Sequence, residues 1–135
     1  MASPSGNGSP PPSEQAWFGV DDMDGCVVVS ATGEVDLATS PGLSDAMKVA
    51  VESGSRTIVD LSGVTFLDST GLQVLVQARI RARDRRALIA LVAPAGMPRR
   101  VLEVSQLDQA FAVFDSLEKA VAALTQADTG DQRDS

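Results

Sequence analysis

Asp68, Ser69 and Thr70 bring a carboxylate and two hydroxyls together in the stretch VTFLDSTGL, residues 64–72. Alternating apolar residues precede this group and helical spacing follows it, so a strand should end and a helix begin here. The first amide N–H groups of a helix lack partners within the helix and carry partial positive charge. Because such amides stabilise a dianion, a hydroxyl held here is well placed to carry a phosphate, and Ser69 would then be a switch.

A purely structural role fits the same residues. Asp68 or Ser69 would cap the helix, while Thr70 and Gly71 would shape the turn. In either case Gly71, which has no Cβ, allows another backbone or a ligand to approach closely. The stretch DSTG alone leaves both interpretations open.

The elements that must position DSTG form an alternating α/β chain. Two β-prone runs, 17–23 and 26–33, flank Asp24-Gly25, which is a strong hairpin signal. The order ββαβαβαβα predicts the fold class α/β, with a mixed sheet opened by a β-hairpin and packed by alternating helices. The later apolar patterns predict helices at 40–53, 71–86, 97–104 and 115–126, and strands at 57–64, 87–94 and 110–114.

Particular residues mark the predicted helix starts. Ser40 is placed to cap the first helix, with Pro41 at its first position. Asp115 is the expected cap of the last helix, and Glu118 completes a carboxylate variant of the capping box. The apolar residues predicted to share one face of the first helix are Leu37, Leu43, Met47, Val49, Ala50 and Val51.

Composition predicts one folded domain over residues 16–126. Residues 1–15 are rich in Ser, Pro and Gly, and we expect them to be a disordered tail, because such a segment buries too little apolar surface to offset the entropy of ordering. The acidic end, 127–135, is expected to be disordered likewise. A hydrophobic fraction of 44% is sufficient for one core.

Charge and residue types exclude several functions. With 11 basic and 18 acidic residues, the net charge of −7 argues against direct nucleic-acid binding. No apolar run is long enough to span a membrane and no secretory signal is present, so we expect a cytoplasmic protein. The chain has no His and one Cys, Cys26, which we expect to be a buried thiol, so we expect no metal and no cofactor. The scarcity of general bases and of lysines argues against an enzyme.

Arginines concentrate in the run RIRARDRR, residues 79–86. Such a run could form a stripe for nucleic acid, or it could be a solvated helix end or the rim of a partner interface. We favour the latter two, because the alternation spreads four side chains around a helix and away from one face: Arg79, Arg81, Arg83 and Arg85.

Two motifs together resemble a known family. GEVD at 33–36 and VDLSGVTFLDSTGL at 59–72, with the strand and helix order after them, resemble the STAS domain of anti-sigma factor antagonists. In that family a GELD-like acidic loop lies beside the helix start, and the serine after the aspartate is the phosphoacceptor. The resemblance therefore implies phosphorylation of Ser69. It also implies a partner-binding set consisting of Glu34, Asp36, Asp68, Thr70, Gly71, Leu72 and Gln73.

The resemblance implies a binding protein that is regulated by phosphorylation. Its expected partner is an anti-sigma factor with a histidine-kinase-like ATPase fold, which binds the unphosphorylated antagonist or phosphorylates its serine. A PP2C-type phosphatase would reverse the modification. The alternative is a stand-alone STAS module that binds a ligand or nucleotide, or that serves as a stressosome-type signalling subunit.

Two positions depart from the family pattern. Gln73 stands where many relatives carry a small residue, which would alter the fit to a partner. Gln106 replaces the glycine of an SGL motif, which removes an easy left-handed helix stop, so we expect a local change in that turn.

A response-regulator receiver is a further α/β alternative, because Asp21, Asp22 and Asp60 superficially match its acidic pocket. The context argues against it. A hairpin signal follows Asp22 where a receiver would begin a helix, and neither lysine lies at a late strand end.

Overall fold

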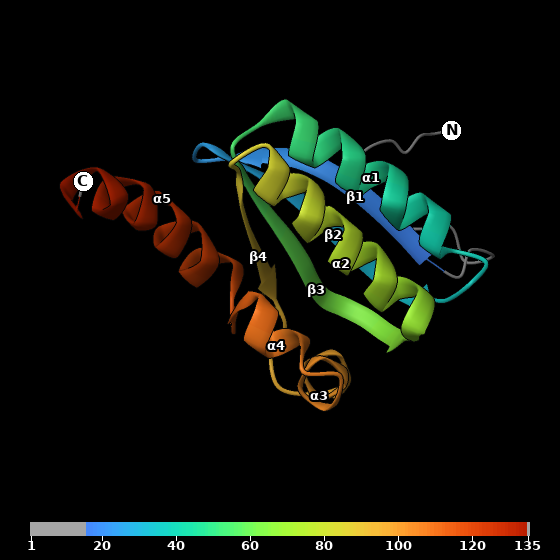
Figure 1. Ribbon diagram of the computed structural model, residues 1–135. Coiled ribbons are helices and arrows are strands. Elements are labelled where there is room, and N and C mark those ends of the chain that lie inside the picture. Colours follow the sequence, from blue (N-terminus) through green and yellow to red (C-terminus); the bar gives the residue numbers. More distant parts are fainter. Residues whose placement is uncertain (1–15, 135) are drawn as a thin grey trace.

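The computed structural model describes the backbone of residues 16–134 and the side chains of residues 16–126. Five strands form one sheet in the order β1-β2-β3-β4-β5. β1 pairs with β2 in antiparallel fashion and the remaining pairs are parallel, which confirms the predicted mixed sheet (Figure 1). The elements are β1 Ala16–Met23, β2 Cys26–Val35, α1 Ser40–Ser53, β3 Arg56–Leu67, α2 Ser69–Asp84, β4 Leu88–Val92, α3 Met97–Val104, α4 Leu107–Ala110, β5 Ala112–Phe114 and α5 Leu117–Asp134.

The opening hairpin turns at the predicted dipeptide. Met23 pairs with Cys26, so Asp24 and Gly25 form a two-residue loop. Both have positive φ, at 52° and 86°, as a turn that matches the twist of its strands requires. The Asp-Gly sequence therefore determines both the position and the conformation of this turn.

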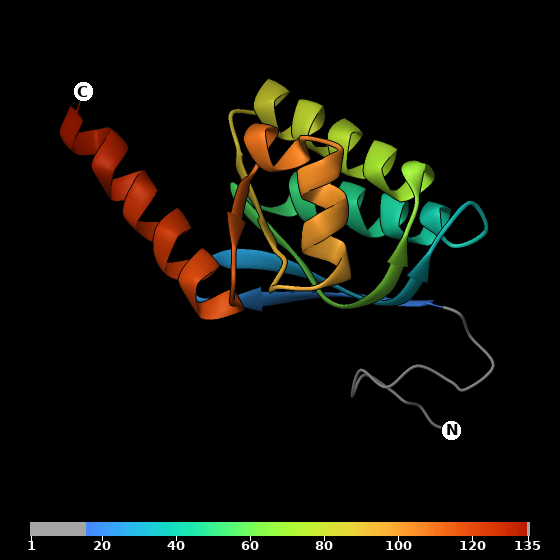
Figure 2. The same ribbon diagram turned by 90° about the horizontal axis from the view of Figure 1, so that it is seen from below.

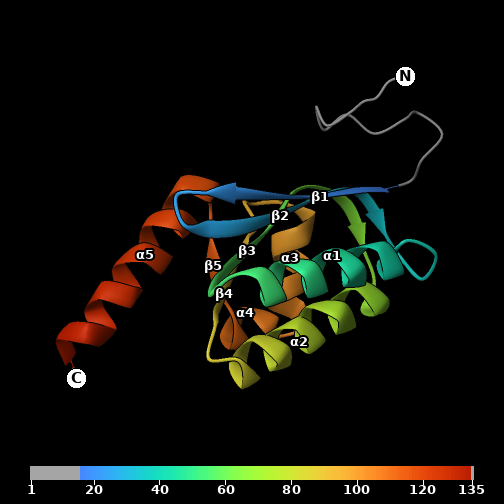
Figure 3. The same cartoon turned by 90° about the horizontal axis from the view of Figure 1, so that it is seen from above.

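Helices cover the two faces of the sheet unequally. α1, α2 and α3 pack on one face around the larger core, in which Leu43, Leu61 and Leu75 are fully buried (Figure 2). On the other face, Ala120 and Leu124 of α5 pack against β2, β3 and β4. Figure 3 shows that the later turns of α5 extend away from the sheet. The first face therefore holds most of the apolar side chains.

Cys26 lies in the smaller core, as the sequence predicted. Its side chain is 1% exposed, and burial raises the pKa of the thiol, while the charge of Arg56 acts in the opposite direction. A neutral apolar thiol is therefore the stable form at this position.

Two predicted caps are displaced by one residue. Thr39, and not Ser40, is the N-cap of α1, and Ser40 is buried in the first turn. At the last helix, the Ser116 hydroxyl accepts a hydrogen bond from the Lys119 amide at 3.2 Å. Asp115 instead pairs with the Arg99 guanidinium at 2.8 Å, so it joins α5 to α3 and does not cap.

The apolar face of α1 is narrower than predicted. Leu37 precedes the helix and is 74% exposed, and Val49 is 56% exposed on the solvent side. The buried residues of α1 are Ser40, Leu43, Met47, Ala50 and Val51. Val49 lies on the polar side of the helix, where Asp45, Glu52 and Ser53 are its neighbours at helical spacing.

The turn after α3 keeps a left-handed residue without a glycine. Gln106 adopts φ 65°, and its amide donates to the Glu103 carbonyl at 3.1 Å. The backbone of this turn therefore has the left-handed conformation that a glycine would adopt, and the difference from glycine is the Gln106 side chain. The short helix α4 follows directly and was not predicted.

Both chain ends were predicted to be disordered. The predicted tail at 1–15 lies outside the described residues. At the other end, α5 continues as helix to Asp134, and the domain boundary predicted at 126 stays a prediction.

Candidate functional site

The strand-to-helix junction lies where the sequence predicted it. β3 ends at Leu67, Asp68 is the N-cap, and α2 begins at Ser69. The Asp68 Oδ1 accepts the amides of Thr70 at 2.9 Å and Gly71 at 3.3 Å. It also accepts the Thr70 hydroxyl at 2.5 Å. One carboxylate oxygen thus satisfies two of the first amides of the helix.

These contacts stabilise the ionised carboxylate of Asp68. The hydrogen bond from the Thr70 hydroxyl is the largest cause of a lowered pKa, and the amides of Gly71 and Thr70 add to it, against partial desolvation. Because the charged form accepts more strongly, the cap is strongest when Asp68 is ionised.

We expect the cap to weaken in acid. A carboxyl whose pKa is lowered by folding stabilises the protein above its unfolded pKa, near 3.8, and loses that contribution as the pH falls through the folded value. Asp68→Asn keeps a cap acceptor but not the charge. In urea titrations, the wild type should exceed this variant in stability at pH 6, and the difference should shrink as the pH falls below 3.8 and through the lowered folded pKa. Asp45→Asn, at an exposed position of α1, is the control, and a difference that is constant with pH would contradict the prediction.

The two adjacent hydroxyls have different surroundings. Ser69 is exposed, and among the described residues its hydroxyl has no hydrogen-bond partner. The Thr70 hydroxyl is half-buried and donates to Asp68. Only the Ser69 oxygen is therefore both accessible and unoccupied.

The acidic loop lies beside this junction, as the parallel pairing of β2 and β3 requires. The Asp68 amide donates to the Val35 carbonyl at 3.1 Å, which joins the end of β2 to the start of α2. Figures 1 and 2 show the loop after β2 next to the first turn of α2. Asp36, from the loop, and Asp68 therefore face the same edge of the sheet.

Hydrogen bonds within the loop fix its shape. The Asp36 Oδ1 accepts the amides of Ala38 at 3.0 Å and Thr39 at 3.1 Å. The Thr39 hydroxyl donates to the Glu34 carbonyl at 2.7 Å. The side chain of Glu34 is exposed on a strand that is irregular at this point, where the register shifts between Gly33 and Glu34. Asp36 thus has a structural role, and Glu34 is directed to solvent.

Gly71 and Leu72 serve the fold at this site. Gly71 is buried, and a Cβ built on it would lie 2.7 Å from the Val35 Cγ1 and 2.7 Å from the Leu67 Cδ1. The close approach expected at this glycine is thus made by side chains of β2 and β3. Leu72 is half-buried against the larger core.

A groove between α1 and α2 extends from the junction. Its volume is about 360 Å³, and it contains Gln73 and Thr70 among its walls. Sequence reasoning did not find the remaining lining residues, although the spacing 70, 73, 74, 77 marks one face of α2. These residues are Leu37, Ser40, Ser44, Val74 and Gln77.

The residues of the receiver alternative do not come together in the part of the chain that the structure describes. Asp60 accepts the Ser62 amide at 2.9 Å within β3, while Asp21 and Asp22 are exposed on the outer strand, so no receiver-like pocket forms.

Residues 16–126 contain no cluster of acids, His or Cys suited to a metal ion. Among the described helices, none has the length and apolar character needed to cross a bilayer.

The chain belongs to the STAS domain family, whose model matches residues 20–120. It is 32% identical over 106 residues to the anti-sigma-F factor antagonist RsfB of Mycobacterium tuberculosis, which covers 78% of this chain and 86% of that protein. Solved structures agree. The crystal structure of an anti-sigma factor antagonist from Mycobacterium paratuberculosis matches with a TM-score of 0.76 at 32% identity, over 82% of this chain and 94% of that one.

The fold is shared more widely. The Bacillus cell fate determinant SpoIIAA, solved in its phosphorylated form, matches with a TM-score of 0.62 at 18% identity, over 79% of this chain and 98% of that chain. The STAS fold predicted from the two motifs is therefore confirmed.

Proposed function

We propose that this chain is an anti-sigma factor antagonist that binds a kinase-like anti-sigma factor while Ser69 is unmodified and loses it when Ser69 is phosphorylated. One observation carries the proposal: the Ser69 hydroxyl is exposed and without a partner in the described structure, at the first turn of a helix. Amides at such a position favour a phosphate. The protein acts as ligand and substrate, without catalysis of its own, and its place of action is the cytoplasm.

The hydrogen bonds favour Ser69 over Thr70 as the acceptor. Transfer of a phosphoryl group requires a hydroxyl that can enter the active site of the kinase and release its proton. The Thr70 hydroxyl is bound to Asp68, and its use would break the cap of α2. Modification of Ser69 leaves that cap in place.

The surroundings of Ser69 offer a surface for a protein partner. Leu37, which lines the groove between α1 and α2, is 74% exposed, and Phe66, near the end of β3, is 47% exposed. Exposed apolar side chains near a groove are typical of protein interfaces. With Glu34 and Gln73 at the surface as well, we infer that the partner presents apolar and basic groups to this edge.

The relatives support this assignment by their names, since the curated Mycobacterium tuberculosis protein is an antagonist of an anti-sigma factor. SpoIIAA, which shares the fold, has been solved in a phosphorylated form, and this supports the proposal. A PP2C-type phosphatase would restore the binding form of this chain.

Capture of the partner tests the proposal. Immobilised Ser69→Ala protein is exposed to an extract of the source cells, and bound proteins are identified by mass spectrometry, with Ser69→Glu as the matched bait. We expect a protein with a histidine-kinase-like ATPase domain on the Ser69→Ala bait and little of it on the other. Equal capture by both baits, or capture of no such ATPase, would contradict the proposed function.

Phosphopeptide mapping tests the acceptor. The captured ATPase and ATP should place one phosphate on wild-type protein, at Ser69, because of the two hydroxyls at the junction only that of Ser69 is exposed. Thr70→Ser, which keeps a hydroxyl for Asp68, should be modified at Ser69 as well, and Ser69→Ala should remain unmodified. A phosphate found on residue 70 would refute the choice of Ser69.

A further inference from the structure

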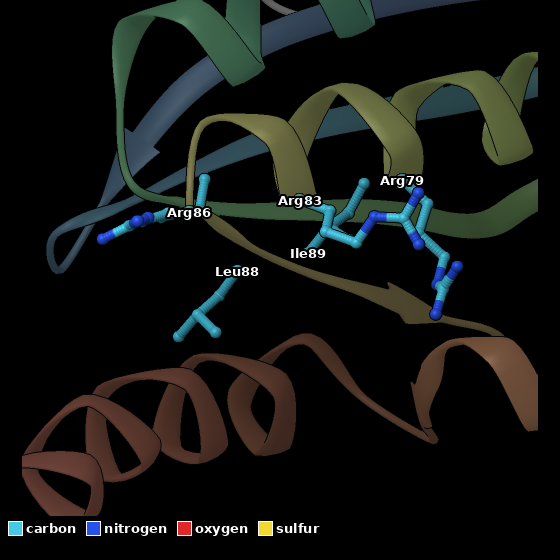
Figure 4. A pocket seen from close by; sticks show the side chains of 6 residues that line it. Arg79, Arg83, Arg86, Leu88 and Ile89 are labelled. Carbon is cyan, nitrogen blue, oxygen red and sulfur yellow. The ribbon is translucent and has the colours of Figure 1, made fainter. Parts of the chain in front are cut away.

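A second hollow lies at the far end of α2, away from Ser69. Its volume is about 350 Å³, and it is lined by Arg79, Arg83, Arg86, Ala87, Leu88 and Ile89. α2 has 16 residues, so its ends are about 24 Å apart. Figure 4 shows Arg86 on one side of this arginine pocket and Arg79 with Arg83 on the other, with Leu88 and Ile89 between them.

Two of the arginines come from one side of the helix. Arg79 and Arg83 are four residues apart, so they are neighbours on α2 although the run as a whole alternates. The Arg79 Nε donates to the Ala110 carbonyl at 2.8 Å, which holds its guanidinium over the pocket. None of the three arginines forms an ion pair with a carboxylate among residues 16–126. Their charges are therefore available to an anion.

Arg86 occupies a position that normally favours glycine. The Ala87 amide donates to the Ala82 carbonyl at 2.8 Å and the Arg86 amide to the Arg83 carbonyl at 3.0 Å, which is the hydrogen-bond pattern of a Schellman helix end. Arg86 has φ 58° there, a conformation that is sterically unfavourable for a long side chain. Strained backbone of this kind is concentrated at functional sites.

The floor of the arginine pocket is apolar because the last strand is short. β5 pairs only with residues Ala90–Val92, so Leu88 and Ile89 lie at an open edge of the sheet. Together with Ala87 they are half-buried. The pocket thus combines cationic walls with an apolar base.

We propose that the arginine pocket binds a small phosphate monoester that carries an apolar group. Guanidinium groups bind phosphate in a planar, bidentate manner, and a dianion suits the neighbouring Arg79 and Arg83 better than a monoanion does. Ile89 points to the face covered by α2 and Leu88 to the face of α5, so the apolar group would lie along the open edge of β4 between them and remove that edge from water. The site is separate from the Ser69 switch and does not depend on the function proposed for it.

Calorimetry with the full-length protein at low salt tests this site, with hexyl phosphate as the probe. We expect hexyl phosphate to bind at least about tenfold more tightly than inorganic phosphate, because only the former covers the apolar floor. Hexanoate, a monoanion with a similar tail, should also bind more weakly. No measurable binding of hexyl phosphate, or an affinity for it no greater than that for inorganic phosphate or for hexanoate, would overturn the proposal.

Matched arginine variants locate the site. Arg83→Gln should weaken hexyl phosphate binding about tenfold, the usual effect of losing a charged hydrogen bond. Arg81→Gln makes the same charge change on the same helix but lines a different hollow, with Gln77, Ile80 and Asp84, and should leave affinity within about twofold. Equal losses in both variants would show a non-specific charge effect and refute the site.

Arg86→Gly separates binding from stability. Relief of the left-handed conformation should raise the melting temperature by about 3 °C, while hexyl phosphate binding falls about fivefold. A variant that is more stable and binds hexyl phosphate as tightly as wild type would exclude Arg86 from the site. A fall in affinity with an unchanged Ser69 phosphorylation rate would confirm that the two ends act independently.

Discussion

Phosphorylation of Ser69 should lower the affinity for the anti-sigma factor by about 100- to 1000-fold and leave the fold intact. Such a loss requires about 3 to 4 kcal/mol of binding free energy. A phosphoserine adds a charge of about −1.5 to −2 at neutral pH. It lies at the positive end of α2, where the free domain can accommodate it.

The bound state is different because a partner removes water from this edge. Asp68 is half-buried next to Ser69, and Asp36 is held in the neighbouring loop. Docking would desolvate these carboxylates together with the phosphate, and like charges repel more strongly when water is excluded. The added bulk would also keep the partner from the surface around Leu37 and Phe66.

Titration calorimetry with the captured anti-sigma factor measures this effect, and circular dichroism follows the fold. Ser69→Glu should reproduce part of the loss, since it carries one charge instead of two, and Ser69→Ala should bind like the unmodified protein. If phosphorylation melts the domain, or if the phosphorylated form binds as tightly as before, the electrostatic explanation fails.

Gly71→Val should destabilise the domain by about 3 kcal/mol, a change of roughly 150-fold in the folding equilibrium. A first side-chain carbon at this position already lies 2.7 Å from the Val35 Cγ1, and Val35 is fully buried at the end of β2. Valine adds two further methyl groups and has restricted rotamers in a helix. α2 would have to move away from the sheet, and the Ser69 junction would move with it.

Gln73→Val is the matched control, because it introduces the same side chain two residues later at an exposed position. Its stability in urea denaturation should be within about 0.5 kcal/mol of wild type. If both variants lose the same stability, the effect arises from valine in the helix and not from the contact between α2 and β2.

Local signals in the sequence determined much of the fold. The two-residue turn requires two positive φ values in succession, and few residue pairs other than Asp-Gly adopt them easily. The hairpin at Asp24-Gly25 was therefore predictable to the residue. The Asp68 cap was predictable for a similar reason. Its short side chain reaches the first amides of α2 only from the residue before the helix.

Features that depend on tertiary contacts were not predictable. Asp115 and Ser116 are both good caps, and Arg99, from a helix distant in sequence, decides between them by pairing with Asp115. Leu37 was predicted to lie on the buried face of the first helix. Because α1 begins only at Ser40, after the N-cap Thr39, Leu37 lies outside the helix and is exposed. In each case a neighbour in space, or a shift of one residue, outweighed local preference.

The candidate site, like the fold, was predictable only in part. Asp68 and Ser69 were singled out from their types and spacing and Asp36 from the family resemblance, and their functional roles stay predictions. The roles of Gly71 and Thr70 required the structure, which shows the glycine buried and the threonine hydroxyl bound to Asp68. The arginine pocket was missed because alternation in sequence concealed the pair Arg79 and Arg83, and because the left-handed turn that presents Arg86 has no glycine to mark it.

Each strand of the sheet lies beside the strand that precedes it in the chain. During synthesis at about 5 to 20 residues per second, every new strand can therefore add to the growing edge without separating an earlier pair. The Ser69 junction needs only β2, β3 and α2, whereas the arginine pocket needs β4 and the Ala110 carbonyl that holds Arg79. The growing chain can therefore form the Ser69 junction before the residues that complete the arginine pocket, at the other end of α2, have been synthesised.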